Sequence, residues 1–151
     1  MPRPLAILAA AAIIAAFAAP AFAAKPEIYT GRFSNLAVGG YDVVAYFDDG
    51  AAVKGAKDFS YDYEGAVWRF TSEDNLERFK MNPAAFEPQY GGYCAWAVSQ
   101  GYTASANPEN WTIHGGKLYL NYDDRVQADW LKDPDGFIAK ADRNWPAVLS
   151  K

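Results

Sequence analysis

Cys94 is the only cysteine of the 151-residue chain, and its surroundings are the part of the sequence best suited to chemistry. It stands at the end of the segment Gly91-Gly92-Tyr93-Cys94. A thiolate is a strong nucleophile and a soft metal ligand where its environment lowers the thiol pKa. The glycines allow the backbone to approach the sulfur closely. The competing interpretation is an inert, packed residue, because free cysteines are among the most buried residue types.

His114 is the only histidine and the second candidate metal ligand. Protein sites for transition metals such as zinc use three or four ligands, so Cys94 and His114 would need further donors. Cu(I) prefers thiolate ligands, which makes copper the metal most compatible with this pair. His114 precedes Gly115 and Gly116, and a solvated histidine in a hairpin turn is the simpler interpretation.

Several polar and aromatic residues are candidates to line a ligand site together with Cys94: Tyr41, Asp42, Tyr93, Tyr119 and Asn121. Asp42 follows a Gly-Gly turn and could serve as a general base or a polar anchor, although an aspartate in a turn commonly bonds its own backbone. Tyr119 and Asn121 are two residues apart and share one face of an expected strand. The alternative for this pair is an ordinary solvent-facing strand surface.

The composition argues against several classes of partner. The chain carries a net charge of −4 at pH 7 and has no cluster of Lys or Arg, whereas nucleic acids and anionic membranes require a basic face. The sequence contains no Ser/His/Asp nucleophile elbow, phosphate-binding loop or paired-cysteine redox motif. The expected partner is therefore a small molecule or a metal ion.

The first 23 residues have the pattern of a cleaved export signal. Arg3 gives a positive start, residues 5–17 form an uncharged apolar run, and Ala21-Phe22-Ala23 provides a small-x-small cleavage pattern before Ala24. The apolar run is shorter than the roughly 20 residues that span a membrane. We therefore expect a periplasmic protein without stable membrane insertion, formed by a single domain over residues 24–151.

The remaining pattern predicts an α+β fold in which a small antiparallel sheet with hairpins packs against three or four helices. β-branched and aromatic residues predict a first strand over 43–47. Two hairpins are expected, with arms at 59–63 and 66–70 and at 111–113 and 117–120. Capping residues predict helices that begin after Ser72, Asp123 and Asp133.

Several stretches, taken in order, resemble the exported bacterial branch of the YHS-domain family. They are residues 40–47, 65–72, 90–95, 118–121 and 141–145, and the resemblance extends over about residues 29–145. It implies a small α+β domain but no particular reaction, because the branch has no settled activity. Some members of the branch are described as selenoproteins, which implies a reactive chalcogen at the position of Cys94.

The chain departs from the metal-linked YHS modules, which hold paired cysteines. It reads Phe70-Thr71-Ser72, with Asn75 where a second cysteine would stand, so metal binding through the usual YHS cysteines is not supported. The leading hypothesis is a periplasmic accessory protein that binds a small ligand or a soft metal ion, such as copper, around Cys94. The alternatives are a thiol-dependent redox enzyme that uses Cys94 and a structural or interaction module with an inert cysteine.

Overall fold

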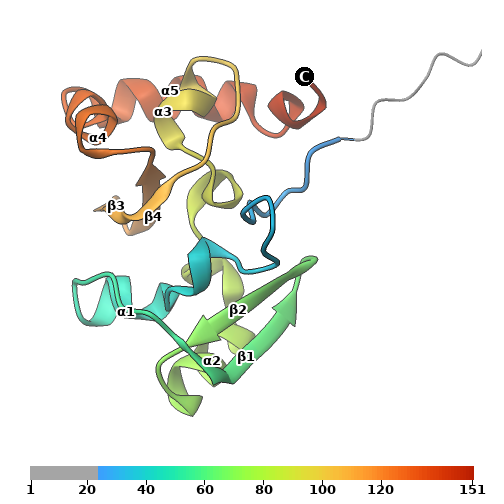
Figure 1. The fold of residues 1–151 in the computed structure, drawn as a ribbon. Coiled ribbons are helices and arrows are strands. Elements are labelled where there is room, and N and C mark those ends of the chain that lie inside the picture. The colour runs from blue at the N-terminus through green and yellow to red at the C-terminus, as the bar shows by residue number, and fades with distance from the viewer. Residues whose placement is uncertain (1–23) are drawn as a thin grey trace, which may run out of the picture.

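The computed structural model describes residues 24–151, so the expected export signal lies outside the described residues. Over these residues the chain forms five α-helices and two antiparallel two-stranded sheets (Figure 1). The expected α+β class is therefore confirmed, with the strands arranged as two separate hairpins. No helix in the described part of the chain is long and apolar enough to span a membrane.

The first half of the molecule contains one hairpin and two helices, which lie together at the lower end of Figure 1. Its elements are α1 (Val43–Asp48), β1 (Ala56–Tyr63), β2 (Ala66–Phe70) and α2 (Glu73–Met81), followed by the 3-10 turn η2 (Pro83–Ala85). The side chain of Ser72 accepts a hydrogen bond from the amide of Asn75, which confirms the predicted start of α2. Trp68 and Phe79 pack against each other, with ring centroids 4.8 Å apart, in the core of this half.

The predicted strand over residues 43–47 is wrong, because this segment forms helix α1. The side chain of Asp42 caps the helix by accepting hydrogen bonds from the amides of Val44 and Ala45. The first four residues of α1 are all buried, so their apolar run has no polar alternation. A short apolar run of this kind suits a buried helix as well as a buried strand, and the cap decides between them.

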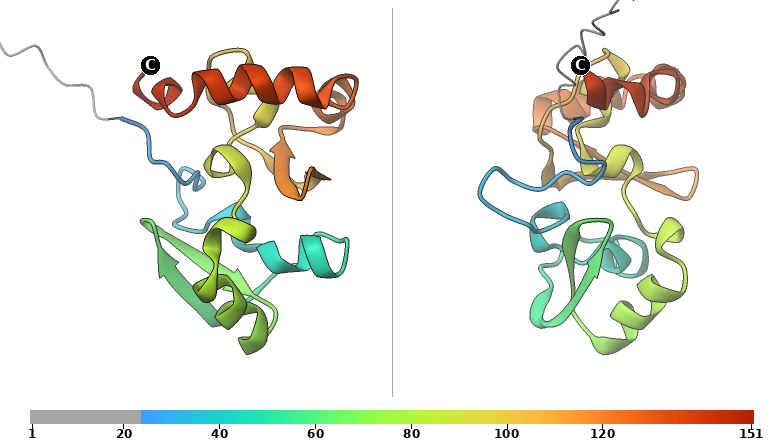
Figure 2. Two further views of the ribbon diagram at one scale, coloured as in Figure 1. Left: turned by 180° about the vertical axis from the view of Figure 1, so that it is seen from behind. Right: turned by 90° about the vertical axis from the view of Figure 1, so that its right-hand side faces the viewer.

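The second half holds the other hairpin and three helices, at the upper end of Figure 1 and seen from behind and from the side in Figure 2. Its elements are the 3-10 turn η3 (Gln89–Gly92), α3 (Ala95–Ser99), β3 (Asn107–His114), β4 (Lys117–Asn121), α4 (Asp124–Trp130), α5 (Pro134–Asn144) and the final turn η4 (Ala147–Ser150). Asp123 and Asp133 cap α4 and α5 with their side chains, as predicted. Strand β3 begins earlier than expected, at Asn107, with an irregular register before Trp111.

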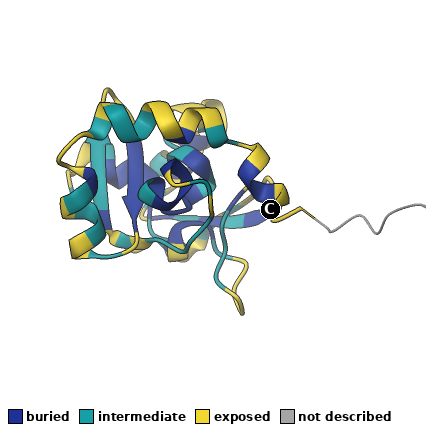
Figure 3. Cartoon of the chain, turned by 90° about the horizontal axis from the view of Figure 1, so that it is seen from above, coloured by how far each residue is buried: buried dark blue, intermediate teal, exposed yellow. Residues whose placement is uncertain are grey.

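Strand β4 lies between two hydrophobic cores. Leu118 and Leu120 are buried in the core of the first half, whereas Tyr119 is buried in the core of the second half. Because successive side chains of a strand point to opposite faces, β4 supplies both cores at once. Seen from above, buried residues fill the middle of the molecule and exposed residues lie on its outer helical faces (Figure 3).

The N-terminal segment of the described chain runs along the second half and is held there by backbone contacts. The amide of Tyr29 donates to the carbonyl of Gly91 at 2.8 Å, and the amide of Lys25 donates to the carbonyl of Leu149 at 2.8 Å. A Cβ on Gly91 would lie only 1.6 Å from the carbonyl oxygen of Glu27. Glycine is therefore required at position 91 by the close approach of this segment.

Candidate functional site

Cys94 occupies the short connection between η3 and α3. Its amide donates to the carbonyl of Ala104 at 3.0 Å, and its carbonyl accepts from the amide of Val98 at 3.1 Å. The residue is only 1% exposed. These backbone bonds fix the position of the side chain, so that the sulfur is presented in a defined direction.

The sulfur is nevertheless not sealed inside the protein, because Cys94 lines a recess of about 240 Å³. The other residues of this Cys94 recess are predominantly apolar: Trp96, Ala97, Tyr102, Ala104, Tyr122 and Val126. Tyr102 and Tyr122 are 47% and 53% exposed. Tyr102 meets the ring of Trp96 edge to face at 6.4 Å. The recess therefore combines a buried thiol with two exposed tyrosines.

Asn121 is the polar neighbour of the thiol. Its Oδ1 lies 3.6 Å from Cys94 Sγ and accepts a hydrogen bond from the amide of Trp96 at 3.1 Å. Because the Trp96 amide can only donate, the orientation of the Asn121 amide group is fixed. Its Nδ2 is buried without a hydrogen-bond partner among the described residues. Buried polar atoms without partners are rare in folded proteins and ask for an explanation.

The surroundings of Cys94 favour the neutral thiol. Burial raises the pKa of Cys94 above its ordinary value of 9.0, and the charge of Asp123 acts in the same direction. Backbone hydrogen bonds from Ala97, Tyr122 and Trp96 oppose this effect only in part. A nucleophilic or metal-binding cysteine has the opposite property, a lowered pKa. At neutral pH the group therefore acts as a weakly polar thiol at the wall of an apolar recess.

The structure brings only Asn121 of the predicted site residues into contact with the thiol. Tyr93 does not line the recess, and its hydroxyl donates to the carbonyl of Pro26 at 2.9 Å. Tyr119 packs on Trp130 with ring centroids 5.2 Å apart. Tyr119 and Asn121 are 3% and 0% exposed, so the alternative of a solvent-facing strand surface is wrong. They lie on the inner side of β4, which the second half covers.

Tyr41 and Asp42 belong to the first half, and neither lines the Cys94 recess. The hydroxyl of Tyr41 donates to Glu109 Oε1 at 2.9 Å. Asp42 is fully buried; besides capping α1, its Oδ2 accepts from the amide and hydroxyl of Thr71 and from Asn75 Nδ2, each at 2.8 Å. This carboxylate connects α1 with the start of α2, and its role in the fold is structural.

His114 is placed at the end of β3, where Nε2 lies 2.8 Å from Asp135 Oδ1. Within residues 24–151, no group of three His, Cys, Asp or Glu side chains is arranged to hold a metal ion. The neutral thiol and its amide neighbour offer a single soft donor. The described residues therefore do not fit a chelating copper site at Cys94.

Sequence reasoning missed most of the residues around the thiol. Trp96 follows Cys94 closely, but Tyr102 and Ala104 come from the loop before β3 and Tyr122 is the residue after β4. No motif or spacing connects these positions. The one available signal was Tyr122, which directly follows the predicted Asn121.

Comparisons with known proteins give one family match. The model of the YHS domain matches residues 44–90, which run from α1 through β1, β2 and α2 to η3. Neither the curated proteins nor the solved structures compared with the chain give a match. The match ends before Cys94. Part of this chain, the first half of the molecule, is thus similar to a YHS domain.

Proposed function

We propose that the protein is an exported, periplasmic accessory protein that binds a small apolar molecule, or the apolar end of a larger one, in the Cys94 recess. The observation that carries the proposal is the open, apolar recess against a thiol that is otherwise buried. Ligand sites are typically concave and apolar with a few oriented polar groups. The thiol and Asn121 supply those groups, while Trp96 and Tyr102 supply aromatic surface.

The raised pKa of Cys94 favours binding over redox chemistry, because a protonated thiol is a poor nucleophile. Copper at the same thiol is the second candidate, because the sulfur of Cys94 is a soft donor of the kind that Cu(I) prefers. A copper ion bound there would need further ligands besides Cys94, because the described residues contain no group of three His, Cys, Asp or Glu side chains that could hold a metal ion. These readings predict different outcomes in a single set of measurements.

The test measures access to the thiol in the native protein. We expect N-ethylmaleimide to modify Cys94 slowly at pH 7.5 without unfolding, and indole, an apolar probe smaller than the recess, to slow the reaction. Ala104→Leu should fill the recess and thereby prevent both the reaction with N-ethylmaleimide and the binding of indole. The matched control is Ala128→Leu, which adds the same side chain at an exposed position of α4.

Two outcomes would overturn the proposal. One is modification of Cys94 only after unfolding, and the other is an unchanged rate in Ala104→Leu. Stoichiometric Cu(I) uptake that is lost in Cys94→Ser would instead support the copper candidate. A sulfenic acid formed at Cys94 under mild peroxide would support the redox alternative.

A further inference from the structure

The two halves of the molecule contain the same order of elements. In each, a Gly-Gly-Tyr turn leads into a short helix, a hairpin and a capped helix: η1 (Val38–Gly40), α1, β1, β2 and α2 in the first half, and η3, α3, β3, β4 and α4 in the second. The corresponding strands have equal lengths, eight residues in β1 and β3 and five in β2 and β4. We call residues 36–81 the first repeat and residues 88–130 the second repeat.

The hairpins correspond residue by residue. The pairing of β1 with β2 shifts between Ala56 and Ser60, and the pairing of β3 with β4 shifts between Asn107 and Trp111, at the same places along the strands. The turns before the short helices also agree, because each has a non-glycine residue and two glycines with positive φ: Val38, Gly39 and Gly40, and Tyr90, Gly91 and Gly92.

Each repeat also packs the same cluster of three rings. They come from the end of the first strand, the middle of the second strand and the helix that follows: Tyr63, Trp68 and Phe79, and His114, Tyr119 and Trp130. The second and third rings have centroids 4.8 Å apart in the first repeat and 5.2 Å apart in the second. The first and third rings meet edge to face in both, at 5.6 and 6.3 Å. Different residues therefore build the same packing.

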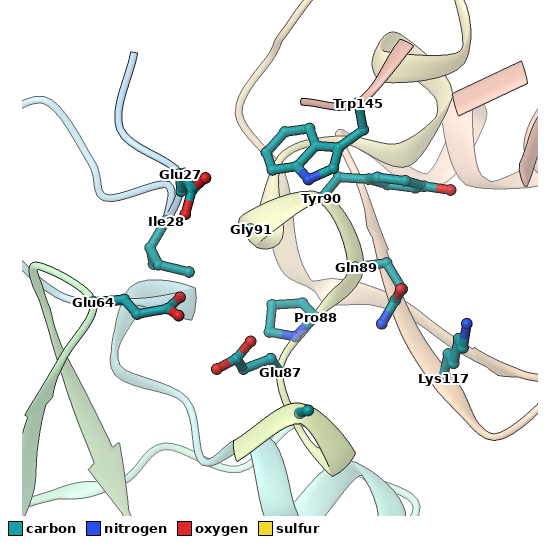
Figure 4. A pocket seen from close by; sticks show the side chains of 11 residues that line it. Glu27, Ile28, Glu64, Glu87, Pro88, Gln89, Tyr90, Gly91, Lys117 and Trp145 are labelled. Carbon is teal, nitrogen blue, oxygen red and sulfur yellow. The ribbon is translucent and has the colours of Figure 1, made fainter. Parts of the chain in front are cut away.

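Figure 4 shows the passage from one repeat to the next. The chain runs from Glu87 into the second repeat at Pro88, with Glu64 of the first hairpin on one side and Lys117 of the second hairpin on the other. The cleft of about 440 Å³ at this junction is lined by residues of both repeats. It therefore has no counterpart within a single repeat, unlike the Cys94 recess.

Asp42 and Cys94 occupy the same position in the two repeats, directly after Gly-Gly-Tyr and at the start of the short helix. The amide of Asp42 donates to the carbonyl of Val53 at 2.8 Å, and the amide of Cys94 donates to the carbonyl of Ala104 at 3.0 Å. The side chains differ, because Asp42 caps α1 whereas the thiol, a weak acceptor, does not cap α3.

The recess lies where the first repeat holds a polar network. Asp42 Oδ2 accepts hydrogen bonds from Thr71 and Asn75. The corresponding residues of the second repeat are Tyr122 and Val126, which line the recess. Tyr122 is half exposed, and valine has no polar group. The second repeat is therefore open at the place that the network closes in the first.

Asn121 takes over part of the missing carboxylate. Its Oδ1 accepts from the amide of Trp96 at 3.1 Å, and Asp42 Oδ1 accepts from the corresponding amide, that of Val44, at 2.9 Å. Its Nδ2 has no partner among the described residues. A carboxylate at position 94 would accept from Trp96, and the Asn121 amide group could then turn so that Nδ2 donates to it.

We infer that the chain contains a tandem duplication of one structural unit, whose second copy lies beyond the YHS match, and that position 94 is the place of a capping carboxylate which the second copy replaces with a thiol. In the proposed function, on which this step rests, Cys94 determines specificity, because it leaves the wall of the recess uncharged. A carboxylate there would exclude an apolar ligand.

Aspartate at position 94 tests the duplication. A carboxylate at a buried position is strongly unfavourable unless donors compensate it. Cys94→Asp should fold, and its urea midpoint relative to Cys94→Asn should rise from pH 3 to pH 7, because amide donors lower the carboxyl pKa and the stabilisation appears as the group ionises. Ala141→Asp, at a position that is equally buried at 1% but outside both repeats, is the matched control. Relative to Ala141→Asn it should lose stability over the same range or fail to fold.

A flat or opposite pH dependence in Cys94→Asp would overturn the inference. If Cys94→Asp does not fold, Cys94→Ser decides the question, because serine is a preferred capping residue and alanine is not. Cys94→Ser should then unfold at a urea concentration at or above that of Cys94→Ala, and a lower midpoint would overturn the inference.

Calorimetry with indole tests the role of Cys94 in specificity. We expect at least about tenfold weaker binding in Cys94→Asp than in Cys94→Ala, because the apolar ligand would strip water from a charge. Equal binding would overturn that role. Failure of indole to bind the unchanged protein would overturn the proposed function together with this role, whereas the duplication is decided by the urea measurements alone.

Discussion

The side chain of Asn121 contacts Cys94 in a way that suits the protonated thiol. An amide oxygen accepts hydrogen bonds, so the contact of Oδ1 with Sγ at 3.6 Å is made by a protonated thiol. Burial acts in the same direction by raising the thiol pKa. Neither lysine nor arginine lines the Cys94 recess to reverse these effects. The sequence identified Cys94 and Asn121 as candidate site residues. It did not predict that their side chains would be in contact or that the thiol would be neutral.

The pH dependence of alkylation should report this environment. We expect the rate of reaction of native Cys94 with iodoacetamide to rise with pH, with a midpoint above the ordinary thiol pKa of 9.0. The chain unfolded in urea serves as the control and should give a midpoint at the ordinary value. A native midpoint below the unfolded one would mean an activated thiolate and would contradict the binding function in favour of redox chemistry.

Helix α1 depends on one buried carboxylate. Asp42 caps α1 through Oδ1 and reaches Thr71 and Asn75 through Oδ2. The sequence predicted a turn aspartate that bonds its own backbone, which is correct for Oδ1. The bonds of Oδ2 join segments about thirty positions apart, and no local pattern announces such a contact. The misassigned strand over 43–47 has a local origin, because a short apolar run suits a buried helix as well as a buried strand.

Removal of this carboxylate should destabilise the protein strongly. For Asp42→Ala we expect a loss of about 3 kcal/mol or more in the free energy of unfolding, because several buried donors lose a charged partner. Ser72→Ala removes a cap with a single hydrogen bond and should cost about 1 kcal/mol. Urea denaturation measures both, and equal losses would show that Oδ2 contributes nothing.

Gly65 and Gly91 both have positive φ, but only at Gly91 would an added Cβ collide with another part of the chain. Substitutions at the two positions therefore distinguish the cost of backbone strain from the cost of a steric clash. Gly65 has φ of +77° with no atom within 4 Å of an added Cβ, whereas Gly91 has φ of +62° and faces the carbonyl of Glu27. Gly65→Ala should cost about 1 kcal/mol through backbone strain alone. Gly91→Ala should cost clearly more and should release the N-terminal segment to hydrogen exchange at Tyr29. If both variants lost the same free energy of unfolding, the N-terminal segment would not be packed closely against position 91.

The complete molecule is organised around two cores that meet at β4. The sequence was sufficient to predict both hairpins and the starts of α2, α4 and α5, because turn and capping residues act locally. It could not predict the Cys94 recess. The lining residues come from separate segments of the second half, such as Cys94, Ala104 and Tyr122, which only tertiary packing brings together.

Because both cores share β4, we expect them to unfold together. Phe79→Ala, in the core of the first half, should cost about 3–5 kcal/mol. The amides of α5, in the other half, should lose the same amount of protection against hydrogen exchange. If the α5 amides of Phe79→Ala kept the same protection against hydrogen exchange as in the unchanged protein, the two halves would unfold independently. Ala128→Leu, on the exposed face of α4, is the neutral control.

The alternation along β4 also restricts which insertions and deletions the gene can tolerate. One extra residue within Lys117–Asn121 would turn the leucines toward the second core and the tyrosine toward the first, and would separate Asn121 from Cys94. Strand β1 is different, because its outer side chains are exposed and its pairing already shifts between Ala56 and Ser60. Length variation among natural variants of this chain should therefore accumulate in β1 and its turn, and be absent from β4.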